Sequence, residues 1–330
     1  MLYNRSMDIP ITQSKAWHKL QEELDERTFY SENKAYLYLA IVKHTPAGNY
    51  LYLPYGPVAQ NPDDMKQALN SLKDLAKTNH CIFIRIEPQL ANKNQYLPKT
   101  AKKVKDISPA DTWILDITPD KPTLIAGFSQ GTRTRYNTYS KKGLIVEKTR
   151  DVSEIQHLVD LQAKLFKSKH LTAYDADYLK AELRQPFASL YLVKYDKKSD
   201  LTRQPANLQA GAGNYPTDGQ VLAASLFFDY EDTRYYMQSA ADQEYRRLPA
   251  TVALLTSAIF DAKEQGIKRF DFWGIAPEGA PADHPWKGFT EFKQSFGGEA
   301  VHYVGTYDII LNPLKYRLYT SLRNIKRRTK

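Results

Sequence analysis

The sequence is poor in cysteine. Its 330 residues include a single one, Cys81, which excludes an internal disulfide framework and a zinc cluster built from cysteines. Cys81 begins the apolar run Cys81–Ile84, and this setting favours a buried, inert thiol over a nucleophile. Long apolar stretches are missing too: none can cross a bilayer, and the N-terminus has no hydrophobic signal core. We therefore expect a cytoplasmic protein.

Signatures of several enzyme classes are also absent. The chain has no Walker loop, no Gly-x-Gly-x-x-Gly and no His-Glu-x-x-His. We expect no serine nucleophile on a strand-to-helix elbow. His284 has no partner at metal-ligand spacing. From these absences we expect that the protein uses no metal and no cofactor.

What the chain does have is an excess of positive charge. Lys and Arg number 46 against 37 Asp and Glu, a net charge of +9. A basic surface suits tRNA, phosphate groups or anionic lipid. The hydrophobic fraction of 42% is that of a globular protein. The length leaves room for two domains of ordinary size.

The order of predicted elements repeats along the chain. In the first half, strands at 35–42 and 50–53 precede a helix at 65–77 and a buried strand at 82–88. The same order recurs in the second half, with its elements at 221–228, 234–237, 251–263 and 270–273. The residues differ, but the order and lengths agree. We therefore predict an α/β protein with mixed sheets, built by internal duplication of one unit.

The most informative stretch follows the last of these strands. Phe270–Ile275 is predicted to be a buried strand, and Trp286–Phe296 a helix closed by Gly297-Gly298. At about 100° per residue, Phe289, Phe292 and Phe296 share one face of that helix, and Lys293 lies with them. In one interpretation this is a core helix whose lysine extends its ammonium to water. In the other, the ammonium faces a negative charge that develops in a cleft.

This stretch resembles a known C-terminal signature. The matching residues are Asp271–Gly274, Gly288-Phe289, Phe292-Lys293, Phe296–Gly298, Tyr303 and Gly305. Together they resemble the FemABX family of peptidyltransferases, which build peptidoglycan cross-bridges from aminoacyl-tRNA. The resemblance implies two tandem GNAT-like domains, residues 1–146 with a docked C-terminal segment 309–330, and residues 147–308. No long heptad stretch occurs, so the chain is similar to the compact, armless, FemX-like subtype.

The GNAT fold often binds acetyl-CoA, but these residues argue against that ligand. The relevant turns are Pro54–Pro57 and Tyr245–Pro249. Their prolines remove backbone donors that would hold a pyrophosphate. The resemblance implies instead that an amine of a stem peptide attacks the ester carbonyl of aminoacyl-tRNA. Lys293 matches the family lysine assigned to the carbonyl oxygen. Glu87, at the end of a buried strand, is the candidate proton acceptor, or else a surface residue that closes the strand.

The resemblance also implies residues that bind the precursor. Thr172 and Tyr178 match a Thr-x-Arg-x-x-x-Tyr pattern, but Tyr174 stands where the arginine would be. This departure weakens the expectation that a nucleotide diphosphate is held in the usual way. Tyr245 and Trp273 complete the predicted substrate-binding set.

A basic segment lies between the two predicted domains. Arg133, Arg135, Lys141 and Lys142 lead to the strand Leu144–Val146. They are expected either to contact tRNA or a pyrophosphate, or to form an ordinary solvated helix face.

The last residues form a basic amphipathic pattern. No acidic residue follows Asp308, and four apolar residues recur at helical spacing: Leu314, Leu318, Leu322 and Ile325. Such a helix can lie on an anionic membrane or on tRNA. We expect its apolar face to dock onto the first domain and its last residues to contact anions, with the inner face of the membrane as one location.

The predicted partners are aminoacyl-tRNA and either a UDP-MurNAc-peptide or a lipid-linked peptidoglycan precursor, with the chain acting as a monomer. Two alternatives stay open. One is another tRNA-dependent transferase of the same fold, acting on a protein N-terminus or a metabolite. The other is a non-catalytic module that binds RNA or membrane.

Overall fold

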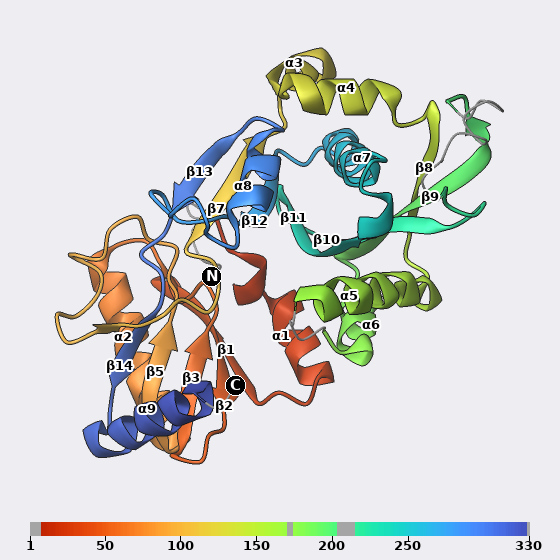
Figure 1. Cartoon of the computed structure of the whole chain (residues 1–330). Helices are drawn as coiled ribbons and strands as arrows, with labels where there is room; N and C mark the ends of the chain where they lie inside the picture. The colour runs from red at the N-terminus through yellow and green to blue at the C-terminus, as the bar shows by residue number, and fades with distance from the viewer. Residues whose placement is uncertain (1–7, 170–173, 203–214, 329–330) are drawn as a thin grey trace. The chain divides into compact units, whose positions relative to one another are not determined.

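The computed structural model describes residues 8–169, 174–202 and 215–328. The chain divides into two compact units (Figure 1): unit 1 comprises Met1–Asp111 and His302–Lys330, and unit 2 comprises Thr112–Val301. The boundaries between the units, at 111/112 and 301/302, thus differ from those expected, at 146/147 and 308/309. Strands β7 (Asp111–Asp116) and β8 (Lys142–Thr149) both belong to the sheet of unit 2, whereas β14 (Tyr307–Ile310) belongs to the sheet of unit 1.

Unit 1 is built on a mixed sheet with the strand order β1-β2-β3-β5-β14-β6 and with β4 beside β2. Its remaining strands are β1 (Thr28–Glu32), β2 (Tyr36–Lys43), β3 (Asn49–Leu53), β4 (Val58–Ala59), β5 (Cys81–Ile86) and β6 (Lys102–Lys103). Strands β3 and β5 are parallel, and the other pairs are antiparallel. Helix α1 (Lys15–Glu23) precedes the sheet, and α2 (Pro62–Thr78) connects the parallel pair. Helix α9 (Pro313–Arg328) follows β14.

Local sequence accounts for α2. The Asn61 side chain accepts a hydrogen bond from the Asp64 backbone, Pro62 occupies the first turn, and Asp63 and Asp64 face the positive end of the helix dipole. The buried side of the helix consists of Met65, Ala68, Leu69, Leu72 and Ala76. These side chains pack against Ile84 and Ile86 of β5 in the core of unit 1.

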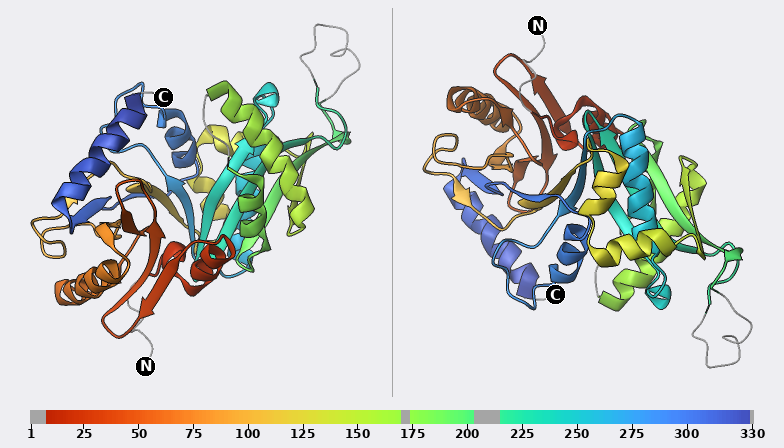
Figure 2. Two further views of the ribbon diagram at one scale, coloured as in Figure 1. Left: turned by 90° about the horizontal axis from the view of Figure 1, so that it is seen from below. Right: turned by 90° about the horizontal axis from the view of Figure 1, so that it is seen from above.

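Unit 2 is built on a second mixed sheet, with the strand order β13-β7-β12-β11-β10-β9-β8. Its other strands are β9 (Ala188–Asp200), β10 (Val221–Tyr230), β11 (Thr233–Ala241), β12 (Arg269–Gly274) and β13 (Glu299–His302). Its helices are α3 (Lys121–Gly127), α4 (Gln130–Thr138), α5 (Ile155–Lys169), α6 (Ala176–Arg184), α7 (Ala250–Glu264) and α8 (Lys287–Gln294). Helix α7 covers one face of the sheet, while α5 and α6 lie on the other (Figures 1 and 2).

The predicted duplication is confirmed by the strand pairing. In unit 1, β2 and β3 are antiparallel and α2 leads to β5, which is parallel to β3. In unit 2, β10 and β11 are antiparallel and α7 leads to β12, which is parallel to β11. The α/β class is therefore as expected. Each unit then adds an antiparallel neighbour from a distant part of the chain, β14 beside β5 and β7 beside β12.

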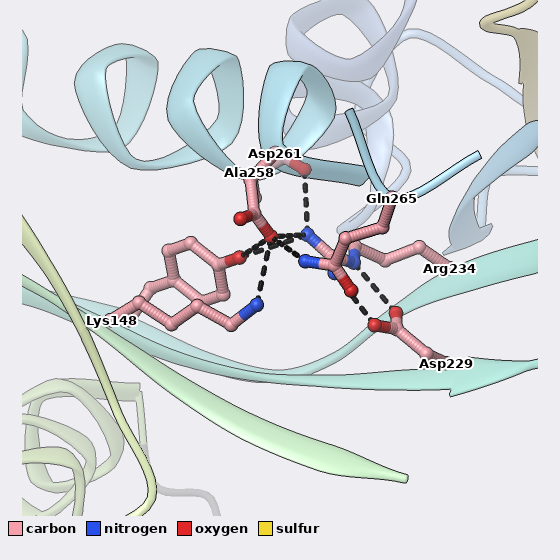
Figure 3. Close-up of polar contacts among 7 residues, drawn as sticks. Lys148, Asp229, Arg234, Ala258, Asp261 and Gln265 are labelled. Carbon is pink, nitrogen blue, oxygen red and sulfur yellow. Dashed lines mark hydrogen bonds and ion pairs between the residues drawn. The ribbon is translucent and has the colours of Figure 1, made fainter. Parts of the chain in front are cut away.

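Each unit also buries an arginine in a two-bond ion pair. In unit 1, Arg85 donates from Nε and Nη2 to the two carboxylate oxygens of Asp308, each at 2.7 Å. In unit 2, Arg234 donates to both oxygens of Asp229, each at 2.6 Å, and to Asp261 at 2.7 Å (Figure 3). Fork-shaped pairing of this kind satisfies several donors of one guanidinium at once.

The Arg85–Asp308 pair decides how α9 packs. The Tyr316 hydroxyl donates to Asp308 at 2.7 Å, and Arg85 donates to the Tyr319 hydroxyl at 3.2 Å. Both rings also contact Phe83 of β5. The C-terminal helix therefore docks on unit 1, but the expected docking face is wrong: the tyrosines face inward, and the leucine face is exposed.

Among the described residues, no helix combines the length and the apolar character needed to cross a bilayer.

The buried ion pair yields a prediction about stability. Replacing Asp308 by asparagine should lower the free energy of unfolding by about 3–5 kcal/mol, because the Arg85 charge loses its counter-charge in a buried site. The measurement is urea denaturation followed by circular dichroism. The matched control is Asp232→Asn, which breaks the exposed pair with Lys268 at 2.9 Å and should cost about 1 kcal/mol or less. Equal costs for the two variants would contradict the prediction.

Candidate functional site

The candidate site lies where β12 ends. Phe270 and Phe272 are fully buried in the core of unit 2, and Asp271 between them is 5% exposed. The Asp271 carboxylate accepts hydrogen bonds from the Thr112 hydroxyl and, at 2.7 Å, from the Trp273 backbone. Burial raises the pKa of this carboxyl. Trp273 itself has a φ of +64°, a left-handed conformation that is costly for a bulky residue, and the bond from its N–H to Asp271 helps to hold it.

Lys293 reaches the same strand end from helix α8. Its Nζ donates to the Gly274 carbonyl at 2.6 Å and lies 4.9 Å from the centre of the Phe289 ring. The side chain is 7% exposed. Burial lowers the pKa of the Lys293 ammonium to about 8, against the opposing attraction of Asp271. We call Asp271, Trp273, Gly274, Phe289 and Lys293 the lysine site.

The surroundings of Lys293 partly match the aromatic face that was expected. Phe296 is fully buried and Phe292 is half-buried, but Phe289 is 39% exposed. Helix α8 ends at Gln294, two residues before the predicted end at Phe296, with Ser295 as its C-cap. The glycine pair follows, with left-handed φ values of +80° at Gly297 and +94° at Gly298. The interpretation in which the lysine extends its ammonium to water is wrong, because that ammonium is buried and bonded to a carbonyl. A lysine ammonium has three donors, so the bond to Gly274 leaves capacity for a substrate oxygen.

Sequence reasoning placed Trp273 and Lys293 among the site residues, and the structure brings both to the end of β12. It did not single out Asp271 or the Gly274 carbonyl. A signal for Asp271 exists, because an acidic residue between two core phenylalanines of one strand is rare unless it is paired.

Glu87 belongs to unit 1, directly after β5, and is 3% exposed. Its carboxylate accepts from the Tyr52 hydroxyl at 2.8 Å and from the Thr306 hydroxyl at 2.6 Å. The backbone N–H groups of Ile107 and Ser108 also donate to it, at 3.3 and 3.1 Å. The alternative of a surface residue is therefore wrong, and four donors surround the group that was expected to accept a proton.

The structure describes four of the five predicted substrate-binding residues. Tyr174 is 50% exposed, and its ring stacks on that of Tyr178 with centroids 5.9 Å apart. Thr172 lies outside the described residues. Tyr245 ends a short 3-10 helix, Gln243–Tyr245, and packs against the core of unit 2.

Tyr178 has a buried partner that the sequence analysis missed. It is hydrogen-bonded to Glu182, one helical turn later on α6, and Gln238 donates to the same carboxyl at 3.2 Å. Glu182 is fully buried, and burial raises the pKa of its carboxyl to about 8. The spacing of four residues on a helix was a signal that could have identified this pair.

The basic segment is divided between structural and exposed side chains. Arg133 donates to the carbonyl of Ala126 at 2.9 Å and to that of Phe128, so it closes the end of α3. Lys142 is half-buried at the start of β8. Arg135 and Lys141 are exposed and can meet an anionic ligand.

The described residues also bear on two other kinds of site, a serine nucleophile on an elbow and a metal centre. Gly127–Gly131 spells Gly-x-Ser-x-Gly, but Ser129 joins two helices and its hydroxyl caps α4, so no strand-to-helix elbow forms there. Within the described part of the chain, no group of three or more His, Cys, Asp or Glu side chains is placed to hold a metal ion.

Comparison with known proteins gives aminoacyltransferases among the curated relatives. Aminoacyltransferase FemA of Staphylococcus epidermidis is 27% identical over 106 residues, which are 32% of this chain and 25% of that protein. FemA of Staphylococcus aureus is 26% identical over 107 residues, with the same coverage. The matched part thus spans about a quarter of the length of these curated relatives.

Solved structures resemble the chain over nearly its whole length. The crystal structure of FemX has a TM-score of 0.78, with 19% identity, over 94% of each chain. L-PGS from Bacillus licheniformis has a TM-score of 0.57, with 15% identity, over 98% of this chain and 100% of that one. At these identities the likeness concerns the fold. The model of the FemAB family matches residues 7–116 and 194–324, more than half of the sequence, and the chain therefore belongs to the FemAB family.

Proposed function

We propose that this chain is an aminoacyltransferase that moves an amino acid from aminoacyl-tRNA to an amine on the stem peptide of a peptidoglycan precursor. Membership of the FemAB family and the FemA relatives support aminoacyl transfer in cross-bridge synthesis. The single observation that carries the proposal is the buried Lys293 ammonium at the end of β12.

The proposed reaction is aminolysis of an ester. The amine nitrogen bonds to the ester carbonyl carbon, and the carbonyl oxygen becomes negatively charged in the tetrahedral intermediate. The bond to the ribose oxygen then breaks, an amide forms, and the proton lost by the amine balances the proton gained by the ribose hydroxyl. Because the ester is already activated, the protein must mainly position the two substrates and stabilise the oxyanion.

Lys293 suits the second of these tasks. Its ammonium is held by the Gly274 carbonyl and by the Phe289 ring, so its position is largely set before substrate binds. A fixed cation in a poorly solvated site stabilises a developing negative charge more than it would in water. The pKa of about 8 keeps most of these side chains protonated at neutral pH, and Asp271 opposes further loss of the charge.

The other residues are assigned by their exposure and partners. Tyr174 and Tyr178 are proposed to bind the precursor, with Glu182 positioning the Tyr178 hydroxyl. Arg135 and Lys141 are proposed to contact tRNA phosphates, whereas Arg133 supports α3. Glu87 can take the amine proton only by exchanging one of its four donors. The amine's own loss of a proton to water is therefore favoured.

The catalytic role of Lys293 is testable by substitution. Lys293→Met should lower kcat by about 10²–10³-fold, the cost of losing one donor to an oxyanion. The assay supplies mixed charged tRNAs and a panel of precursors, soluble and lipid-linked, and detects the amide product by mass spectrometry. The matched control is Lys287→Met, the same change at an exposed position of the same helix, which should leave kcat within about twofold. Unchanged turnover in Lys293→Met would refute the assignment. Product formed only on a protein N-terminus or a metabolite would refute the acceptor.

The burial of Lys293 also predicts a pH-dependent stability difference. Its pKa falls from 10.5 to about 8 in the folded chain, so the unfolded chain binds the proton more tightly. Below pH 8 the folded wild type therefore carries the full cost of a buried charge, about 3 kcal/mol. Between pH 8 and 10.5 this cost declines, and above 10.5 it is gone.

Urea denaturation of Lys293→Met and wild type across this range measures the effect. The free energy of unfolding of the variant, relative to wild type, should fall by about 3 kcal/mol as the pH rises from 7.5 to 10.5. The difference between Lys287→Met and wild type should stay flat. A constant difference for Lys293→Met would show that the lysine titrates normally.

A further inference from the structure

Helix α9 presents two unlike faces, and its rotation about its own axis is fixed. On the inner face, Tyr316 is 4% exposed and its ring centre lies 5.2 Å from that of Phe83. Tyr319 lies 4.9 Å from the same ring. Because the hydroxyls of both tyrosines bond to the buried Arg85–Asp308 pair, turning the helix would break that network. The opposite face is therefore held outward.

That outward face is apolar. Leu314 is 77% exposed, Leu318 51%, Leu322 40% and Ile325 61%. At about 100° per residue these four side chains fall within an arc of about 80°, and we call them the leucine stripe. Single exposed leucines are common on protein surfaces. Among the described residues, however, ten large apolar side chains are exposed, and four of the ten lie on this one helix.

The charged side chains that α9 itself carries are all positive. Lys315 and Arg317 are exposed on α9, and Arg323 is half-buried. The Lys102 ammonium lies 5.4 Å from the ring of Tyr316, which places another cation beside the helix. No acidic residue follows Asp308 in the sequence, and Asp308 is fully buried in its ion pair.

The combination of an apolar stripe and flanking cations distinguishes between two anionic partners, RNA and a lipid bilayer. RNA offers phosphates but would leave four apolar side chains in water or against charged backbone. A bilayer with anionic headgroups offers phosphates at the depth of the cations and acyl chains below them. The helix of 16 residues is about 24 Å long, too short to span the bilayer, which suits a helix lying in its surface.

We propose that α9 binds the surface of an anionic lipid bilayer, with the leucine stripe inserted below the headgroups and Lys315 and Arg317 against them. The chemistry recognised is that of a lipid headgroup above an apolar layer, not that of a free phosphate. The proposal concerns where the protein works and does not rest on the transfer reaction. Combined with the proposed function, it brings the protein to the membrane, where lipid-linked acceptors are found.

The test measures partition of the full chain onto vesicles, with no tRNA or precursor present. Wild type should co-sediment with vesicles of phosphatidylcholine and phosphatidylglycerol and bind pure phosphatidylcholine at least fivefold more weakly. Leu314→Ser/Leu318→Ser/Leu322→Ser should lower partition onto the anionic vesicles at least tenfold. The matched control, Ile107→Ser/Ile145→Ser/Leu201→Ser, removes three exposed apolar side chains elsewhere and should bind like wild type.

Two further variants keep the test decisive if the triple variant folds poorly. Lys315→Gln/Arg317→Gln should lower binding to anionic vesicles about tenfold and leave binding to neutral vesicles unchanged. In Leu318→Trp, the fluorescence of the new indole should shift to the blue when anionic vesicles are added.

Several outcomes would overturn the proposal. These are no vesicle binding by wild type, equal binding by the leucine-stripe variant, or tRNA binding that requires the stripe in a gel-shift assay. A dimer that the stripe variant converts to monomer in sedimentation equilibrium would show that the stripe covers a second copy of the chain. None of these results would affect the transfer assay, so failure here and failure of the proposed function are distinguishable.

Discussion

One buried ion pair connects segments that the chain separates by 223 positions. Arg85 lies on β5 and Asp308 on β14, and their two parallel hydrogen bonds set those strands side by side. A buried pair repays its lost hydration only when geometry is good and the remaining donors and acceptors are satisfied. Here the hydroxyls of Tyr316 and Tyr319 supply that satisfaction. The same interaction thus holds β14 beside β5 in the sheet of unit 1 and decides which face of α9 meets solvent.

The fold could be predicted from sequence to the level of its repeated unit. Apolar runs such as Ile82–Ile86 and the spacing of Leu69 and Leu72 identify strands and helices locally. The boundaries could not be predicted, because β7 and β14 pair with strands far from them in sequence. The orientation of α9 could not be predicted either. Its leucine spacing is equally typical of a docked face and of an exposed one, and only the position of the buried arginine decides between them.

The candidate site, too, could be predicted from the sequence only in part. The aromatic spacing around Lys293 and the glycine pair after it were visible in the sequence, and the structure puts the ammonium 4.9 Å from the centre of the Phe289 ring. Its hydrogen bond to the Gly274 carbonyl depends on how a strand end meets a helix, which no local pattern contains. Glu87 shows the opposite case. Its position at a strand end predicted some exposure, but donors from 107–108 and from Thr306 enclose it.

The interleaved order of the two units has a consequence for synthesis on the ribosome. Unit 2 is continuous in sequence. In unit 1, by contrast, β5 and β6 must wait to complete their pairing until β14, the strand that lies between them, has been synthesised. At ordinary elongation rates this wait lasts on the order of 10–40 s. During that time β5 has an open edge, and such edges invite pairing with other chains. Nascent unit 1 is therefore the half of the molecule that a chaperone would need to shield.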